Sequence, residues 1–105
     1  MPTQKWLTIA RREALPPGQM LRLEIGRSVI GLANVNGQFY AFNDNCPHQD
    51  FPLSEGVLED CCLSCALHGW SFDLRDGHPY PPLLRPYLVT YPLKIEDDAI
   101  KISLE

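Results

Sequence analysis

The sequence predicts an all-β protein built from short antiparallel strands. Ten prolines and seven glycines interrupt its 105 residues at short intervals, as in a chain that turns often. Several of the stretches between them alternate polar and apolar residues, which is typical of half-buried strands. No stretch sustains the apolar period of an amphipathic helix. At this length and with 45% hydrophobic residues, we expect residues 1–105 to form a single domain with one ordered core.

The first elements are a strand, a short connection and a second strand. Lys5–Ala10 mixes polar and apolar residues as a strand does. Arg11–Leu15 is expected to form one helical turn or a loop, and the prolines at 16 and 17 end it. Met20–Ile25 alternates strictly, with aliphatic side chains on one face and Arg22 and Glu24 on the other.

A hairpin is expected next. Ser28–Asn34 is a largely apolar strand, Asn36-Gly37 is typical of a tight hairpin turn, and Gln38–Asn43 returns with three aromatic residues. Together with the earlier strands, these pieces predict an antiparallel meander. At the other end of the chain, Tyr87–Ile95 and Ala99–Leu104 are expected to pair, and Pro92 indicates an edge or a bulge there.

The middle of the chain, from Asn43 to Pro82, combines loops with chemically reactive residues. Asn43–Pro52 contains Cys46-Pro47-His48, and Ser64–Gly69 contains Cys65-Ala66-Leu67-His68. We expect a strand over Val57–Leu63 between these loops and another over Ser71–Leu74. A rigid, proline-rich segment follows at His78–Pro82.

The two loops supply two thiolates and two imidazoles, a donor set that suits a mixed-ligand metal centre. A [2Fe–2S] cluster with two cysteines on one iron and two histidines on the other fits this set. A zinc site is the alternative, because Cys62 and Cys65 form a C-x-x-C pair that could combine with Cys46, His48 or His68. A C-x-H pair is an unusual opening for a zinc site, which favours the cluster.

With these motifs, nearly the whole chain resembles the Rieske family, and within it the small, soluble, low-potential ferredoxins associated with oxygenases. The resemblance implies one [2Fe–2S] cluster per chain, with Cys46 and Cys65 on one iron and His48 and His68 on the other. It also implies a Rieske-like antiparallel β-sandwich or barrel. Approximately residues 43–82 would form a small cluster-binding subdomain with two ligand loops, and residues 1–42 and 83–105 would form basal β-sheets.

The function that this resemblance implies is one-electron transfer from a flavoprotein reductase to a terminal oxygenase. The chain would be a carrier and not an enzyme. Rieske oxygenases add a mononuclear iron bound by two histidines and a carboxylate, and a chain with three histidines, two of them used by the cluster, cannot build that site. Two alternatives stay open: the small subunit of a nitrite reductase, and a zinc-stabilised interaction module.

Charge and composition restrict the partners and the compartment. The net charge of −4 argues against nucleic acid or an anionic membrane and favours a basic protein surface. No apolar run is long enough to span a bilayer, and charges interrupt any signal peptide at Met1–Arg12. We expect a cytoplasmic monomer with reduced cysteines. An acidic collar for the partner is expected from Asp44, Asp50, Glu55, Glu59 and Asp60.

The resemblance also bears on the reduction potential. High-potential members carry a disulfide between the ligand loops, at positions that hold Phe51 and Leu67 here. They also carry hydroxyl donors where this chain has Trp70 and Phe72. Without these donors to cluster sulfur the reduced form is less stabilised, so the potential is expected on the order of −150 mV rather than +300 mV. The pattern assigns no function to Cys61, Cys62 or His78.

Overall fold

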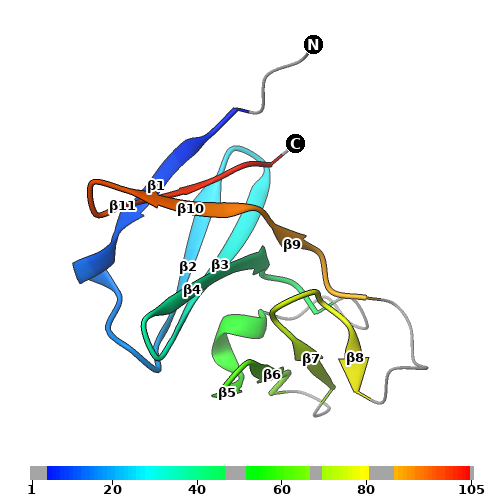
Figure 1. Ribbon diagram of the computed structural model, residues 1–105. Coiled ribbons are helices and arrows are strands. Elements are labelled where there is room, and N and C mark those ends of the chain that lie inside the picture. The colour runs from blue at the N-terminus through cyan, green and yellow to red at the C-terminus, as the bar shows by residue number, and fades with distance from the viewer. Residues whose placement is uncertain (1–4, 47–51, 67–69, 81–86, 105) are drawn as a thin grey trace.

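The computed structural model describes residues 5–46, 52–66, 70–80 and 87–104, and in these ranges it consists of antiparallel strands in three sheets (Figure 1). The first sheet has the order β1 (Leu7–Arg11), β11 (Ala99–Ile102), β10 (Leu93–Glu96). The second has the order β2 (Met20–Ile25), β3 (Ser28–Val35), β4 (Gln38–Asn43), β9 (Thr90–Tyr91). The third has the order β5 (Val57–Glu59), β6 (Cys62–Ser64), β7 (Ser71–Asp73), β8 (Pro79–Tyr80).

The expected all-β class is confirmed. The only helical elements in the described ranges are two 3-10 turns, η1 (Arg12–Ala14) and η2 (Leu53–Glu55). None of the helical segments in those ranges has the length and apolar character needed to cross a bilayer.

The central strand β3 is buried on both faces, which explains its nearly continuous apolar sequence. Ile30 and Leu32 pack toward the β1-β11-β10 sheet with Ile100 and Ile102. Ala33, whose side chain lies on the opposite face of β3 from Leu32, packs with side chains of the third sheet instead. Because neighbouring side chains of a strand point to opposite faces, β3 contributes to two cores. The second sheet therefore lies between the other two (Figure 1).

The Asn36-Gly37 turn forms as the sequence predicts, and both residues have positive φ, 53° and 93°. The meander is confirmed for β2, β3 and β4, which pair consecutively. The first strand does not join it. β1 pairs with β11 from the other end of the chain, with Leu7 opposite Ile102.

Two predicted strands are each divided in the structure. Val57–Leu63 reverses at Asp60, whose φ is 51°, and forms the β5–β6 hairpin. Tyr87–Ile95 is divided at Pro92 into β9, which pairs with β4, and β10, which pairs with β11. Proline has no N–H to donate to a ladder, and the strand changes sheets at that residue. The Pro92 carbonyl still accepts a hydrogen bond from the Ser103 N–H at 3.1 Å.

Candidate metal centre

The two predicted cysteine ligands come together in one buried cluster. Cys46 follows β4 and is 4% exposed, and Cys65 follows β6 and is 3% exposed. Both pack with aliphatic and aromatic side chains of the third sheet and its connections: Leu53, Leu63, Phe72, Leu74 and Leu88. The predicted ligands His48 and His68 lie outside the described residues, so the structure assigns no position to either imidazole.

A buried carboxylate joins the two ends of the first ligand loop. Asp44 Oδ1 accepts a hydrogen bond from the Ser54 N–H at 2.7 Å, and Oδ2 accepts one from the Ser54 hydroxyl at 2.6 Å. Arg22 Nη1 donates to Oδ2 at 3.0 Å and to the Asp44 carbonyl at 3.3 Å. The side chain of Asp44 is 0% exposed. The expectation that Asp44 contributes to an exposed acidic collar is therefore wrong, whereas Glu55, Glu59 and Asp60 are exposed.

The second ligand loop is closed by strand pairing. Ser64 in β6 lies opposite Ser71 in β7, and their hydroxyl oxygens are 2.9 Å apart. Beyond this pair, the Cys65 N–H donates to the Trp70 carbonyl at 2.6 Å. The backbone before and after the segment 66–69 is thus brought together at the position of Cys65.

The turn after β7 is held by a second buried carboxylate. Asp73 accepts hydrogen bonds from the Arg75 side chain at 2.6–3.2 Å and from the Tyr80 hydroxyl at 2.9 Å. The donation by Arg75 lowers the pKa of Asp73 well below its ordinary value, against the opposing effect of burial. The hydrogen bond that the Tyr80 hydroxyl donates to Asp73 raises the pKa of Tyr80. This carboxylate is therefore ionised at neutral pH and fixes the β7–β8 hairpin.

His78 and Asp76 interact at the surface of this hairpin. Their Nδ1 and Oδ1 atoms are 2.6 Å apart, and the imidazole packs edge-on against Tyr80 with ring centroids 5.0 Å apart. The contacts with Asp76 and Tyr80 give His78 a structural role in this hairpin, and no role as a metal ligand is needed to account for it.

The adjacent cysteines Cys61 and Cys62 are both half-buried and line the same open pocket, but only Cys61 also packs against the core. Cys61 is half-buried against the core that contains Cys46 and Cys65, and its thiol donates to the Tyr40 hydroxyl at 3.9 Å. Burial and this contact raise the pKa of Tyr40. Cys62 lines an open surface pocket with Arg75 and Tyr80. All four cysteines are in the described part of the chain and none is in a disulfide.

The C-x-x-C zinc alternative receives no support from this arrangement. Cys62 borders a solvent-facing pocket, whereas Cys65 is in the core. The two buried thiols fit the sulfur-donor side of an iron–sulfur cluster, because thiolates are the ligands such clusters use and apolar walls protect them from water.

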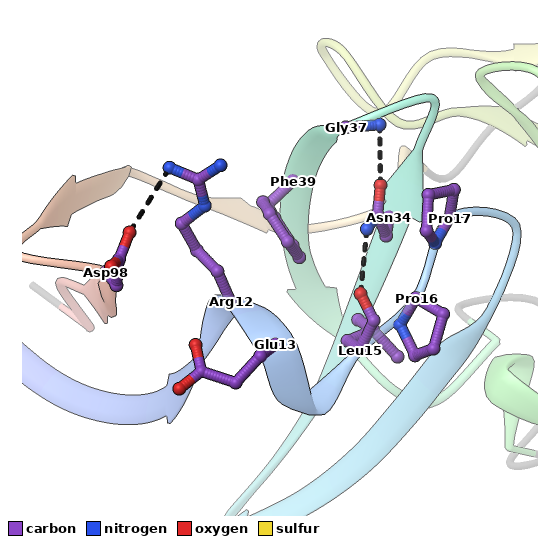
Figure 2. A pocket seen from close by; sticks show the side chains of 9 residues that line it. All are labelled: Arg12, Glu13, Leu15, Pro16, Pro17, Asn34, Gly37, Phe39 and Asp98. Carbon is purple, nitrogen blue, oxygen red and sulfur yellow. Dashed lines mark hydrogen bonds and ion pairs between the residues drawn. The ribbon is translucent and has the colours of Figure 1, made fainter.

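An open cavity of about 450 Å³ lies elsewhere, between η1, the β3–β4 turn and the β10–β11 turn (Figure 2). Most of its polar groups are partnered with one another, and Glu13 pairs with Arg11 outside the lining. Asn34 donates to the Leu15 carbonyl at 2.7 Å and accepts from the Gly37 N–H at 2.7 Å, and Arg12 pairs with Asp98 at 3.4 Å. The cavity contains none of the predicted ligand residues, and its contacts are those of a stabilised turn.

Comparison with known proteins identifies the class of this fold and site. Residues 5–91 match the family model described as the Rieske [2Fe-2S] domain. The chain therefore belongs to the Rieske [2Fe-2S] domain family, whose name states the cofactor, and the resemblance drawn from the sequence is confirmed.

The similar proteins are small ferredoxins of dioxygenases. The chain is 44% identical over 92 residues to the ferredoxin component of biphenyl 2,3-dioxygenase from Rhodococcus jostii, covering 87% of this chain and 85% of that protein. It is similar to a chain in the complex of reduced oxygenase and oxidised ferredoxin of carbazole 1,9a-dioxygenase, with a TM-score of 0.87, 27% identity and coverage of 98% and 96% of the two chains.

The fold is shared more widely. A putative NADH-dependent nitrite reductase small subunit from Mycobacterium tuberculosis has a TM-score of 0.87 at 20% identity, covering 99% of this chain and 98% of that one. At 20% identity, this similarity shows a shared fold only.

Proposed function

We propose that this protein carries one electron at a time from a flavoprotein reductase to a terminal oxygenase, on one Rieske [2Fe–2S] cluster per chain. Cys46 and Cys65 would bind one iron, and His48 and His68 the other. The observation that carries the proposal is the convergence of the two thiols, from separate loops, in one buried core within a chain of the Rieske family.

The similar proteins support the partners in this proposal. A relative that is 44% identical is named as the ferredoxin component of a dioxygenase, and a similar solved chain comes from a complex of an oxygenase with a ferredoxin. A ferredoxin component receives its electron from one protein and delivers it to another. The chain accordingly needs no catalytic residues of its own.

The cluster, when bound, supplies a centre that accepts and releases one electron without breaking a bond. The chain contributes burial and orientation. Leu53, Leu63 and Phe72, each 0% exposed, pack around the two thiols and exclude water from the sulfur side. The described ends of both loops are held by hydrogen bonds, Asp44 to Ser54 in the first and Cys65 to Trp70 in the second.

Residues 43–82 would form the cluster-binding subdomain, and the separate β5-β6-β7-β8 sheet within this range supports that division. The protein would work in the cytoplasm, and four cysteines without a disulfide are consistent with a reducing compartment.

Analysis of anaerobically purified protein tests the cofactor. We expect two irons and two acid-labile sulfides per chain, and an electron paramagnetic resonance signal after reduction. His68→Cys and His48→Ala should abolish or weaken the mixed-ligand signal, whereas Cys62→Ser should retain it. Zinc without sulfide, or an unchanged spectrum in either histidine variant, would show that the ligand assignment is wrong.

Partner specificity is tested by reconstitution. With a flavoprotein reductase and an aromatic-ring dioxygenase, addition of the protein should restore electron flow from NADH to the oxygenase. Stable co-purification with a large sirohaem subunit instead would favour the nitrite reductase alternative, whose small subunit has a similar fold.

A further inference from the structure

A set of three residues far apart in the sequence holds the ends of the first ligand loop. Arg22 comes from β2, Asp44 from the end of β4, and Ser54 from η2. We call these three residues the Asp44 clamp. Asp44 and Ser54 stand before and after the segment that contains Cys46 and His48. The clamp therefore closes that segment into a loop whose ends are fixed.

The clamp is held by hydrogen bonds to both oxygens of the Asp44 carboxylate. Both carboxylate oxygens of Asp44 accept hydrogen bonds from Ser54, one from its backbone N–H and one from its hydroxyl. The Ser54 N–H lies in the first turn of η2, where Pro52 supplies no side-chain cap. The Asp44 carboxylate thus caps η2 from a distant part of the chain.

The charges of the clamp are balanced, and its carboxylate is buried whereas the Arg22 side chain is partly exposed. The Asp44 side chain is fully buried, and a buried carboxylate is tolerated when it is paired and hydrogen-bonded. Arg22 supplies the positive charge and also donates to the Asp44 carbonyl. The backbone of Asp44 is fixed in addition by its own N–H, which donates to the Val29 carbonyl at 2.9 Å.

We infer that the Asp44 clamp is the positioning element for the first iron-ligand loop, and that its paired charges influence the reduction potential of the site. This inference rests on the proposed function. The second loop is closed by its own hairpin, with Ser64 opposite Ser71. The described ends of the first loop are not joined by strand pairing. The side chains of Arg22, Asp44 and Ser54 hold these ends together instead.

Iron retention is the first test. In Asp44→Asn, the charge pair with Arg22 is lost, and iron release to a chelator should be about tenfold or more faster, the usual effect of removing a partner that orients metal ligands. Ser54→Ala should also release iron faster, whereas Ser54→Thr, which keeps the hydroxyl, should be close to wild type. Glu13→Gln is the matched control, because it breaks an exposed carboxylate–arginine pair remote from both loops.

The reduction potential gives a readout that loss of stability would not reproduce. Removing the negative charge in Asp44→Asn should raise the midpoint potential, and removing the positive charge in Arg22→Gln should lower it. Arg22→Lys should restore the wild-type value. Potentials that move in the same direction in both variants, or iron release from Asp44→Asn no faster than from Glu13→Gln, would overturn the inference.

Hydrogen exchange separates failure of the clamp from failure of the proposed function. The amides of Leu53 and Ser54 should exchange faster in Asp44→Asn than in wild type, with or without bound iron, because Asp44 accepts a hydrogen bond from the Ser54 N–H. If wild-type protein contains no iron and sulfide, the proposed function fails, and this exchange measurement still decides whether the clamp closes the loop. If Asp44→Asn does not fold, the Ser54→Ala and Ser54→Thr pair gives the same comparison with the carboxylate intact.

Discussion

Two buried aspartates illustrate how single residues organise this protein. Asp44 and Asp73 are almost completely buried, and each is paired with an arginine whose side chain is partly or mostly exposed. Asp44 holds the ends of the first ligand loop, and Asp73 holds the hairpin that follows the second. Both are ordinary acidic residues in the sequence. Their contacts, and not their residue type, give them these functions.

The depressed pKa of Asp73 predicts a pH-dependent contribution to stability. Hydrogen bonds from Arg75 stabilise the carboxylate in the folded state, so the folded pKa lies below the unfolded value. The contribution is fully present above the unfolded pKa, about 4, and is lost as the pH falls through the folded value. The urea midpoint of the wild-type protein should therefore be higher than that of Asp73→Asn at neutral pH. The difference between the two midpoints should shrink steadily below about pH 4.

Exposed Glu59 provides the control for this measurement. Glu59→Gln should leave the urea midpoint nearly unchanged at neutral pH, since exposed substitutions of this kind have small effects. A difference between wild type and Asp73→Asn that stays constant from pH 7 down to about pH 2 would contradict the titration of Asp73 as its cause.

At the scale of elements, the β7–β8 turn docks on the chain segment before β9. The Leu88 N–H donates to the Gly77 carbonyl at 2.9 Å, and the Gly77 N–H donates to the Asp73 carbonyl at 2.6 Å. Gly77 has a φ of +85°, and a Cβ at this position would collide with the Leu88 carbonyl oxygen. Both the backbone conformation and the close approach require glycine.

Gly77→Ala is therefore expected to destabilise the protein by about 1 kcal/mol or more, because alanine is strained at this φ and has no room. The loss should appear as a lower urea midpoint. Gly37→Ala is the matched control: its φ is also positive, at 93°, but a Cβ there meets nothing within 4 Å. If the two variants lose equal stability, backbone conformation and not the contact with Leu88 is the cause.

At the scale of the whole molecule, the second sheet lies next to the third (Figure 1), and the core that contains the two buried thiols takes side chains from both sheets. Their core includes Ala33, Val35 and Phe42 from the second sheet and Leu63 and Phe72 from the third. The sulfur side of the proposed cluster is thus walled by hydrocarbon. Phe72, fully buried, brings no hydroxyl to this wall, and half-buried Trp70 brings none either.

This environment predicts a low reduction potential. With no hydroxyl donors at Trp70 and Phe72, and no cysteines at positions 51 and 67, the added negative charge of the reduced cluster is weakly stabilised. A redox titration of the loaded protein should give a midpoint on the order of −150 mV, at the low end of the Rieske range. A clearly positive midpoint near neutral pH would contradict this expectation.

Much of the fold follows from local pattern. The alternation in Met20–Ile25 and the Asn36-Gly37 turn predicted the β2–β4 meander, because strand faces and tight turns depend on neighbouring residues. The paired Cys/His motifs predicted the family, and the two cysteines do meet in the core. The ligand role of the four residues stays a prediction, with the histidines outside the described residues.

Other features depend on contacts between distant residues, and only the tertiary structure decided them. The pairing of β1 with β11, the change of sheets at Pro92, and the contact of Arg22 and Ser54 with Asp44 have no counterpart in local periodicity. The sequence by itself determined the strand class and the motif chemistry, because both depend on the kind and spacing of neighbouring residues. Which sheet each strand joined, and which acidic side chains became buried, was decided by packing between segments far apart in the chain.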